Sequence, residues 1–404
     1  MHCTARSSRA SCHHRSYHKP RNKHMSKDHQ ARRAPISLER STPPACPNLK
    51  ETVREGLRAL SDSTEIQNGV RQHRFSGTEA DKAHAAKWLG LRFQRAVDPQ
   101  RIILTNGAQS AMVLALASVA APGDTVLTEE LTYYGFRKHA HLQGIRTETI
   151  AMDDDGAEPQ AFEMACRKFA PKALFLMPTI HNPTTIVMSL ERRQRVVQIA
   201  RQYGVSIIED DVYGVLAESV PAPFGALAPE MTWHITSFAK CVGPGVRVGY
   251  LVAPHGKAAQ TTLDRFYGMS TWFAAPFSVE LVNLWLASGS MQKIVAGVRD
   301  EAVARQRIAT QWLAGISFRT RPDALFLWLD LEGIIDQDEL VAQCASRNIT
   351  IRPGRIFATD PKLPLNRVRL VIGSPESRDE LEAAMAVVGG VLQGARKGAV
   401  AGVR

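Results

Sequence analysis

The order of apolar and polar positions from about residue 100 onward is typical of alternating strands and helices. Short apolar runs that predict buried strands lie at residues 101–105 (RIILT), 125–128, 173–177 (ALFLM) and 205–208 (VSII). Segments of helical periodicity lie at residues 109–120, before a Pro-Gly-Asp turn, and 190–203, before a glycine. Strands that are apolar throughout and separated by helices predict a parallel α/β sheet.

The helix expected at residues 190–203 is amphipathic. Its apolar side holds Val196, Val197, Ile199 and Ala200. Its arginines are expected largely on the opposite, polar side: Arg192, Arg193, Arg195 and Arg201.

A second unit, with a different pattern of apolar and polar residues, begins near residue 275. Helices are expected at residues 288–313, 336–347 and at the C-terminus, and strands at 324–331 and 366–372. Only one helix, at residues 49–60, is expected before residue 75. The predicted organisation is a leader (1–34), an N-terminal arm (35–75), a large domain (76–274), a smaller α+β domain (275–395) and a tail (396–404).

The net charge of +11 is concentrated in the leader. Residues 1–34 hold nine Lys/Arg against one acidic residue, a net charge of +8, which leaves +3 for the other 370 residues. The leader also holds six histidines and few large apolar residues, so we expect it to be disordered. It is interpreted as untranslated sequence before a start at Met25, as a solvated tail, or as a targeting or nucleic-acid-binding segment. A histidine metal site is disfavoured, because disorder leaves the ligand geometry unset.

The composition of the whole chain is typical of a globular enzyme, with 44% hydrophobic and 22% charged residues. No apolar run reaches the roughly 18 residues of a membrane span. Six cysteines are scattered without a CxxC pair or a secretory signal, which indicates reduced thiols and a cytoplasmic protein.

Polar residues follow the carboxyl ends of the predicted strands, where α/β sheets bind their ligands. Ala108 and Gln109 open a helix after a glycine, and the free N–H groups of such a turn suit an anion. Asn182 follows the strand at residues 173–177, is held by Pro183, and can donate to a phenolate oxygen. Taken alone, each motif is more often an ordinary turn.

Two further clusters bring charge to the same edge. Asp210 follows the strand VSII and would suit a protonated ring nitrogen, with Tyr213 three residues on. Lys240 lies in a Gly/Pro-rich loop, and a lysine that forms imines needs surroundings that lower its pKa. Ser237, three residues before it, and Arg247, seven after it, are suitable partners for a phosphate.

The ordered set GAQ…HNPT…EDDVYG…SFAKCVGPGVRVGY resembles class I/II aminotransferases of fold type I. In texture it is most similar to the aminotransferase module of MocR-type regulators and to aminoadipate or aromatic aminotransferases, over about residues 35–390. The resemblance implies a fold type I transferase with a mostly parallel-sheet large domain and a smaller α+β C-terminal domain. It also implies a homodimer and the cofactor pyridoxal 5'-phosphate.

The resemblance assigns roles by position. Lys240 would hold the cofactor as an imine and transfer the substrate proton. The residues that would bind the rest of the cofactor are Asp210 at the pyridine nitrogen, Asn182 and Tyr213 at the ring hydroxyl, Tyr133 stacked on the ring, and Ala108, Gln109, Ser237 and Arg247 at the phosphate. Arg369 would clamp the substrate α-carboxylate, with Asn182 beside it.

Two positions depart from the family pattern. Gln72 stands where a tyrosine usually reaches the phosphate of the neighbouring subunit, and Thr185 replaces a glycine after Asn-Pro-Thr. The implied activity is transfer of an amino group between an L-amino acid and a 2-oxo acid. A lyase, decarboxylase or oxidase reaction on the same fold remains open, as does a sensor module. Nucleic-acid binding is disfavoured because residues 1–75 show no winged helix-turn-helix, and no metal site is expected.

Overall fold

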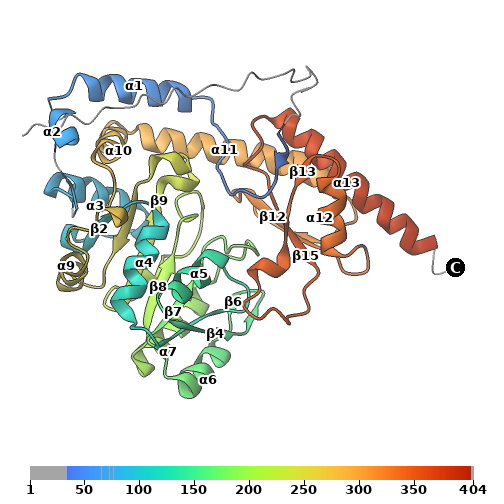
Figure 1. The fold of residues 1–404 in the computed structure, drawn as a ribbon, viewed down its shortest axis with the longest axis horizontal. Coiled ribbons are helices and arrows are strands. Elements are labelled where there is room, and N and C mark those ends of the chain that lie inside the picture. Colours follow the sequence, from blue (N-terminus) through green and yellow to red (C-terminus); the bar gives the residue numbers. More distant parts are fainter. Residues whose placement is uncertain (1–33, 65, 72, 76, 402–404) are drawn as a thin grey trace, which may run out of the picture. The chain divides into compact units, whose positions relative to one another are not determined.

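The computed structural model describes residues 34–64, 66–71, 73–75 and 77–401. The leader up to residue 33, with Met25, and the departure at Gln72 lie outside them. A seven-stranded sheet forms the centre of the larger part (Figure 1). Its strands, in spatial order, are β2 (Ile102–Thr105), β10 (Gly249–Val252), β9 (Thr232–Ser237), β8 (Ser206–Asp210), β7 (Ala173–Leu176), β3 (Thr125–Glu129) and β4 (Arg146–Ile150).

The sheet is parallel except at β10, which runs antiparallel to both of its neighbours. A direct loop joins β9 to β10, and without a helical crossover two adjacent strands run in opposite directions. This confirms the predicted fold class, a mostly parallel α/β sheet. The loop between β9 and β10 carries Lys240.

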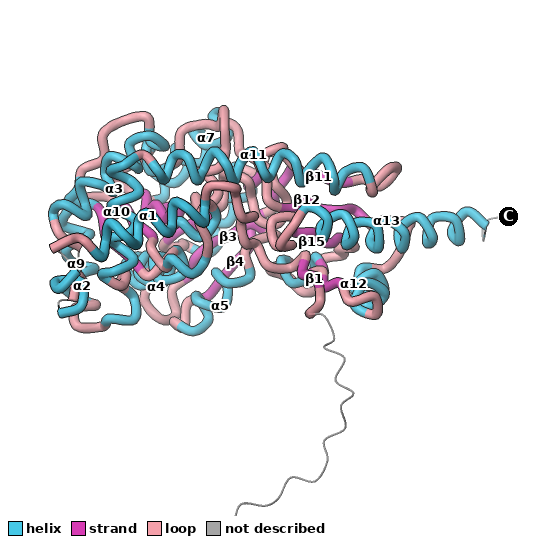
Figure 2. The backbone as a smooth tube through the Cα atoms, turned by 90° about the horizontal axis from the view of Figure 1, so that it is seen from above, coloured by secondary structure: helices cyan, strands magenta, loops and turns pink. Residues whose placement is uncertain are grey.

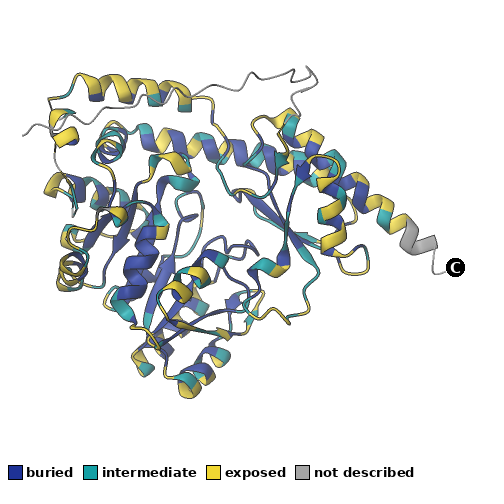
Figure 3. Cartoon of the chain, viewed as in Figure 1, coloured by how far each residue is buried: buried dark blue, intermediate teal, exposed yellow. Residues whose placement is uncertain are grey.

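The strands β2, β3, β7 and β8 are buried on both faces, as their apolar runs predicted, whereas the edge strand β4 is exposed or half-buried over most of its length (Figure 3). In β7, Phe175 packs in one core with Met112 of the neighbouring helix, whereas Leu174 and Leu176 pack in another core with Val196. This alternation follows from the two-residue period of a strand. The sheet therefore lies between two helical layers.

Among the described residues, ten helices surround this sheet. They are α1 (Leu49–Ser61), α2 (Ile66–Arg71), α3 (Glu79–Phe93), α4 (Ala108–Val119), α5 (Tyr134–Leu142), α6 (Pro159–Phe169), α7 (Leu190–Tyr203), α8 (Phe224–Leu227), α9 (Gly256–Arg265) and α10 (Pro276–Ser288). The three with predicted limits, α1, α4 and α7, begin and end within one residue of those limits. Two short strands, β5 (Met152–Asp153) and β6 (Gly156–Ala157), form a hairpin. The Ser189 hydroxyl caps the start of α7, and Gly204 ends it in a left-handed conformation.

The prediction for Arg193 in α7 is wrong. Its side chain is fully buried instead of lying on the polar side. It donates to the carbonyl oxygens of Met188, Ala222 and Pro178 at 3.0, 3.1 and 2.8 Å. Helical periodicity places a residue on a face, but here neighbouring loops cover that face and supply acceptors.

A four-stranded sheet forms the second part, in the order β11 (Phe318–Arg319), β12 (Phe326–Asp330), β15 (Arg367–Val371) and β14 (Arg352–Pro353). Its helices are α11 (Ser290–Gln311), α12 (Gln337–Ala345) and α13 (Arg378–Ala401). Figure 2 shows α11 extending from the side of α1 and α10 toward this sheet. The N-terminal strand β1 (Ile36–Ser37) pairs with β13 (Ile349–Thr350), so the arm begins beside the second sheet.

None of the described helices is both long and apolar enough to cross a membrane. The described cysteines are all buried and unpaired: Cys46, Cys166, Cys241 and Cys344. Within the same residues, no group of three or more His, Cys, Asp or Glu side chains has a geometry suited to a metal ion.

Candidate active site

All ten residues singled out from the sequence line one cavity of about 240 Å³. They are Ala108, Gln109, Tyr133, Asn182, Asp210, Tyr213, Ser237, Lys240, Arg247 and Arg369. Nine of them come from segments at the carboxyl edge of the large sheet, which is where a parallel sheet gathers its loops. Arg369 comes from β15 of the second sheet, so the cavity lies where the two sheets meet.

One end of the cavity has the features of an anion site. Gly107 caps α4 with a φ of 77°, and a Cβ there would lie 3.5 Å from the guanidinium of Arg247. Arg247 is held by Asn106, to whose side-chain and main-chain oxygens it donates at 3.0 and 2.6 Å. The buried Ser237 hydroxyl has no hydrogen-bond partner among the described residues. A helix N-terminus, a fixed arginine and a free hydroxyl together suit a phosphate.

Lys240 lies inside the cavity with its amine held by the N-terminal arm. Its Nζ donates to the main-chain oxygen of Ser41 at 2.7 Å. The pKa of Lys240 is lowered to about 8, mainly by burial and also by the nearby Arg369, while Asp210 opposes the shift. A substantial fraction of the amine is therefore neutral near pH 8, and only the neutral amine is a nucleophile or a base.

Asp210 ends β8 as a buried carboxyl group. Burial raises its pKa to about 7, against the stabilising effect of the Val212 N–H and of Lys240. The Tyr213 hydroxyl shares a 2.5 Å hydrogen bond with the Ser41 hydroxyl, and burial raises the pKa of Tyr213 to about 12. A cationic group placed beside Asp210 would favour its ionised form.

Two tyrosines follow β3 at the cavity wall. The Tyr133 hydroxyl accepts a hydrogen bond from Gln109 Nε2 at 2.9 Å, and burial raises the pKa of Tyr133 to about 12. Tyr134 lies beside it with ring centres 5.1 Å apart. The hydrogen bond from Gln109 and the contact with the Tyr134 ring position the Tyr133 ring, which suits an aromatic wall.

Arg369 is almost fully buried, with 3% of its surface exposed. It donates to Asn182 Oδ1 at 2.6 Å and to the main-chain oxygen of Glu39 at 2.7 Å. Asn182 precedes a cis peptide bond to Pro183, and Thr185 adopts a φ of 63°, a conformation that favours the glycine it replaces. The guanidinium is therefore fixed and faces oxygen acceptors within the cavity.

Sequence reasoning missed the residues that the arm and the second sheet bring to the cavity. Glu39, Arg40 and Ser41 follow β1, and Arg352 lies on β14. The alternating I-T-I-R at residues 349–352 is a short strand signal that would have placed Arg352 on one face. No local signal indicated that the arm crosses the site, because its partners lie about 200 to 330 positions away.

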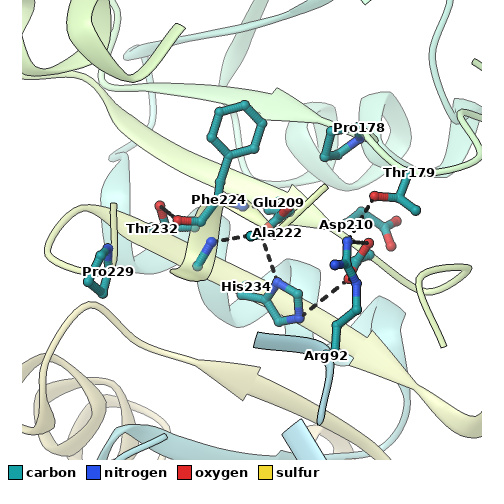
Figure 4. A network of polar contacts seen from close by, with 12 residues as sticks. Arg92, Pro178, Thr179, Glu209, Asp210, Ala222, Phe224, Pro229, Thr232 and His234 are labelled. Atoms are coloured by element: carbon teal, nitrogen blue, oxygen red, sulfur yellow. Dashed lines mark hydrogen bonds and ion pairs between the residues drawn. The ribbon is translucent and has the colours of Figure 1, made fainter. Parts of the chain in front are cut away.

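A buried polar network holds the end of β8, the strand that carries Asp210 (Figure 4). Glu209 shares a 2.8 Å hydrogen bond with His234 Nδ1 and accepts from the backbone N–H of Phe224 at 2.8 Å. Arg92 donates to Asp211 at 2.8 Å. These contacts fix both neighbours of Asp210, so the carboxyl group has little freedom to move.

Comparison with known proteins identifies the family to which this chain belongs. The family model for aminotransferase class I and II matches residues 44–387. This chain belongs to that family. It is 27% identical to the 2-aminoadipate transaminase of Thermus thermophilus over 76% of this chain and 78% of that protein.

The chain is also similar to longer proteins. It is 27% identical to the HTH-type transcriptional regulator YdeF of Bacillus subtilis over 73% of this chain, and it spans 63% of the regulator's length. Among solved structures, the α-aminoadipate aminotransferase LysN of Thermus thermophilus, complexed with N-(5'-phosphopyridoxyl)-L-leucine, aligns with a TM-score of 0.78 at 24% identity. The alignment covers 90% of this chain and 94% of that one, and shows a shared fold.

Proposed function

We propose that this chain is a pyridoxal 5'-phosphate-dependent aminotransferase that moves an amino group between an L-amino acid and a 2-oxo acid. One observation carries the proposal. A half-buried lysine with a pKa near 8 shares a cavity with an anion site, a buried carboxyl group and a fixed arginine. Family membership supports the same conclusion.

The cavity fits the cofactor in three respects. The orphaned Ser237 hydroxyl, the guanidinium of Arg247 and the helix end at Gly107 match a phosphate. The buried Asp210 matches a protonated ring nitrogen, since each would stabilise the charge of the other. The wall formed by Tyr133 matches a flat aromatic ring. When bound, the cofactor supplies an electron sink that weakens the bonds at the substrate Cα.

The protein's own residues would then act as follows. Lys240 Nζ is the group that binds the cofactor and takes the proton from the substrate Cα. Arg369 binds the substrate α-carboxylate in place of the Glu39 oxygen that it now contacts, with Asn182 beside it. Asn182 and Tyr213 would hold the ring hydroxyl, and Ala108, Gln109, Ser237 and Arg247 would hold the phosphate.

Lys240→Ala tests the central role. The variant should lose the visible absorbance of the bound cofactor, because no other lysine lines the cavity among the described residues. Lys257→Ala, at an exposed position on α9, is the matched control and should keep it. An unchanged spectrum in Lys240→Ala would refute the assignment.

A second assay separates the reactions. Incubation of the cofactor-loaded protein with an amino acid and 2-oxoglutarate should yield the 2-oxo acid of the donor. Release of ammonia or carbon dioxide would instead indicate a lyase, oxidase or decarboxylase. Amino-acid binding without turnover would favour a sensor module, the second candidate, which the similarity to the regulator YdeF supports.

A cytoplasmic homodimer completes the proposal. Buried, unpaired cysteines suit a reducing compartment. Large apolar side chains are exposed on α2, on the 266–269 loop and on α10: Val70, Tyr267, Met269 and Phe277. Exposed large apolar side chains are a feature of subunit interfaces. Analytical ultracentrifugation should give twice the chain mass, and Phe277→Glu with Tyr267→Glu should shift the protein toward the monomer.

A further inference from the structure

The cavity contains two arginines on adjacent strands of the second sheet. Arg352 on β14 lies directly opposite Arg369 on β15 in an antiparallel pair, and both side chains line the cavity. Opposed residues of an antiparallel pair project from the same face with Cβ atoms about 4.5–5.5 Å apart. Arg369 is assigned to the substrate α-carboxylate, and this assignment leaves Arg352 without a function.

Arg352 is positioned by its surroundings as well as by its ion pair. Its guanidinium lies over the ring of Tyr134 at 5.5 Å, and its buried Nε has no hydrogen-bond partner among the described residues. Its Nη2 contacts Glu39 Oε2 at 3.2 Å. Both side chains are about 30% exposed, and an ion pair of this exposure contributes little stability. Another carboxylate can therefore replace that of Glu39.

Glu39 bridges both arginines by itself. Its main-chain oxygen accepts from Arg369 at 2.7 Å, while its side-chain carboxylate contacts Arg352 at 3.2 Å. Five carbon atoms connect these two groups, from the main-chain carbonyl carbon to Cδ. A free five-carbon dicarboxylic acid has the same span between its carboxylates. The arm thus holds, between the two arginines, a segment with the skeleton of glutamate.

We propose that Arg352 determines specificity for substrates with a second carboxylate, and that Glu39 occupies this subsite until such a substrate displaces it. The inference rests on the proposed function. An acidic amino acid, or the matching 2-oxo diacid, places its α-carboxylate on Arg369 and its side-chain carboxylate on Arg352. Glu39 then moves away with the arm segment, and no bond is made or broken in this exchange.

Binding of an unreactive diacid tests the subsite independently of catalysis. Calorimetry on the cofactor-loaded protein, and on the cofactor-free protein, compares glutarate with its monoamide glutaramate. Glutarate should bind about 10- to 100-fold more tightly, as expected for a charge-assisted contact. Arg352→Gln should reduce this ratio to less than about threefold, and Glu39→Gln should tighten glutarate binding by removing the internal competitor.

Arg355→Gln provides the matched control. Arg355 lies three positions after Arg352, but its half-exposed side chain contacts Asp338 instead of lining the cavity. This variant should keep the wild-type preference. A preference for glutarate that survives in Arg352→Gln would overturn the subsite, and so would Glu39→Gln binding glutarate more weakly.

Half-reactions with glutamate and glutamine separate the two proposals. If both amino acids react and their rate ratio is the same in Arg352→Gln, the specificity role fails while the aminotransferase function stands. If neither amino acid reacts but glutarate binding depends on Arg352, the function fails and the subsite stands. A preference for ornithine that disappears in Glu39→Gln would show that Glu39 recognises a cation, which overturns the proposal.

Discussion

Replacement of the buried Arg193 by methionine should destabilise the protein strongly. Methionine fills a similar volume, so the change mainly removes the charge and the donors. Arg193 also donates to Thr179 Oγ1 at 3.0 Å. Two of its acceptors keep another donor: Pro178 O accepts from the Met188 N–H, and Thr179 Oγ1 accepts from Arg92. The carbonyl oxygens of Met188 and Ala222 have no other donor among the described residues.

The magnitude follows from these two orphaned acceptors. A buried acceptor without a donor costs about 1–3 kcal/mol. This cost applies in full to the Met188 oxygen, whereas the Ala222 oxygen is only partly buried and costs less, so the pair costs about 2–5 kcal/mol. Glu209 lies 3.9 Å from Arg193 and keeps His234 and two backbone N–H groups as partners in the variant. Loss of its charge interaction with Arg193 therefore adds only a part of the cost of an unpaired buried charge. We therefore expect a loss of about 3–5 kcal/mol, the range typical of a broken buried pair.

Urea unfolding followed by tryptophan fluorescence measures this loss as a change in the free energy of unfolding. Arg195→Met is the matched control, because Arg195 lies on the same helix, is exposed and contacts only the side chain of Gln198 among described residues. It should change stability by less than about 0.5 kcal/mol. A loss below about 1 kcal/mol in Arg193→Met, or equal losses in both variants, would refute the reasoning.

Three further predictions concern the cavity. Because the pKa of Lys240 is about 8, the rate at which the cofactor-free protein captures the cofactor should rise about tenfold per pH unit up to pH 8 and then level off; a flat stopped-flow profile from pH 6 to 8 would contradict this. The pKa of Asp210 is raised from 3.8 to about 7, so ionising it opposes folding fully above pH 7 and not at all below pH 3.8. Asp210→Asn should therefore stabilise the cofactor-free protein at pH 8 by up to about 4 kcal/mol, since the pKa is raised by about 3 at about 1.4 kcal/mol per pKa unit, yet weaken cofactor binding; loss of stability in urea at pH 8 would count against it. In Gly249→Ala, the new Cβ would lie 2.9 Å from the backbone of Gly107 and Thr236, so strand β10 must shift; we expect a loss of about 1–3 kcal/mol and weaker cofactor binding by fluorescence titration, whereas Gly245→Ala, with open space around its Cβ, should change neither.

Apolar runs, helical periodicity and turn residues in the sequence predicted several elements of the fold. Helix α7 covers the predicted residues 190–203 and ends before Gly204, and the predicted apolar runs form strands buried on both faces. The rule that ligand groups follow the carboxyl ends of strands brought nine of the ten expected residues to one cavity. These features depend on neighbours within a few positions or on the regular geometry of a sheet.

The sequence by itself therefore determined the parallel α/β class, four of the seven strands of the large sheet, the approximate limits of the helices it predicted and the set of residues around Lys240. Only the tertiary structure decided that Arg193 is buried, that Ser41 holds Lys240, and that Glu39 spans Arg352 and Arg369. The physical reason is distance along the chain. A helical period or a turn motif reports what lies within one or two turns, whereas each of these contacts forms only when packing brings distant segments together.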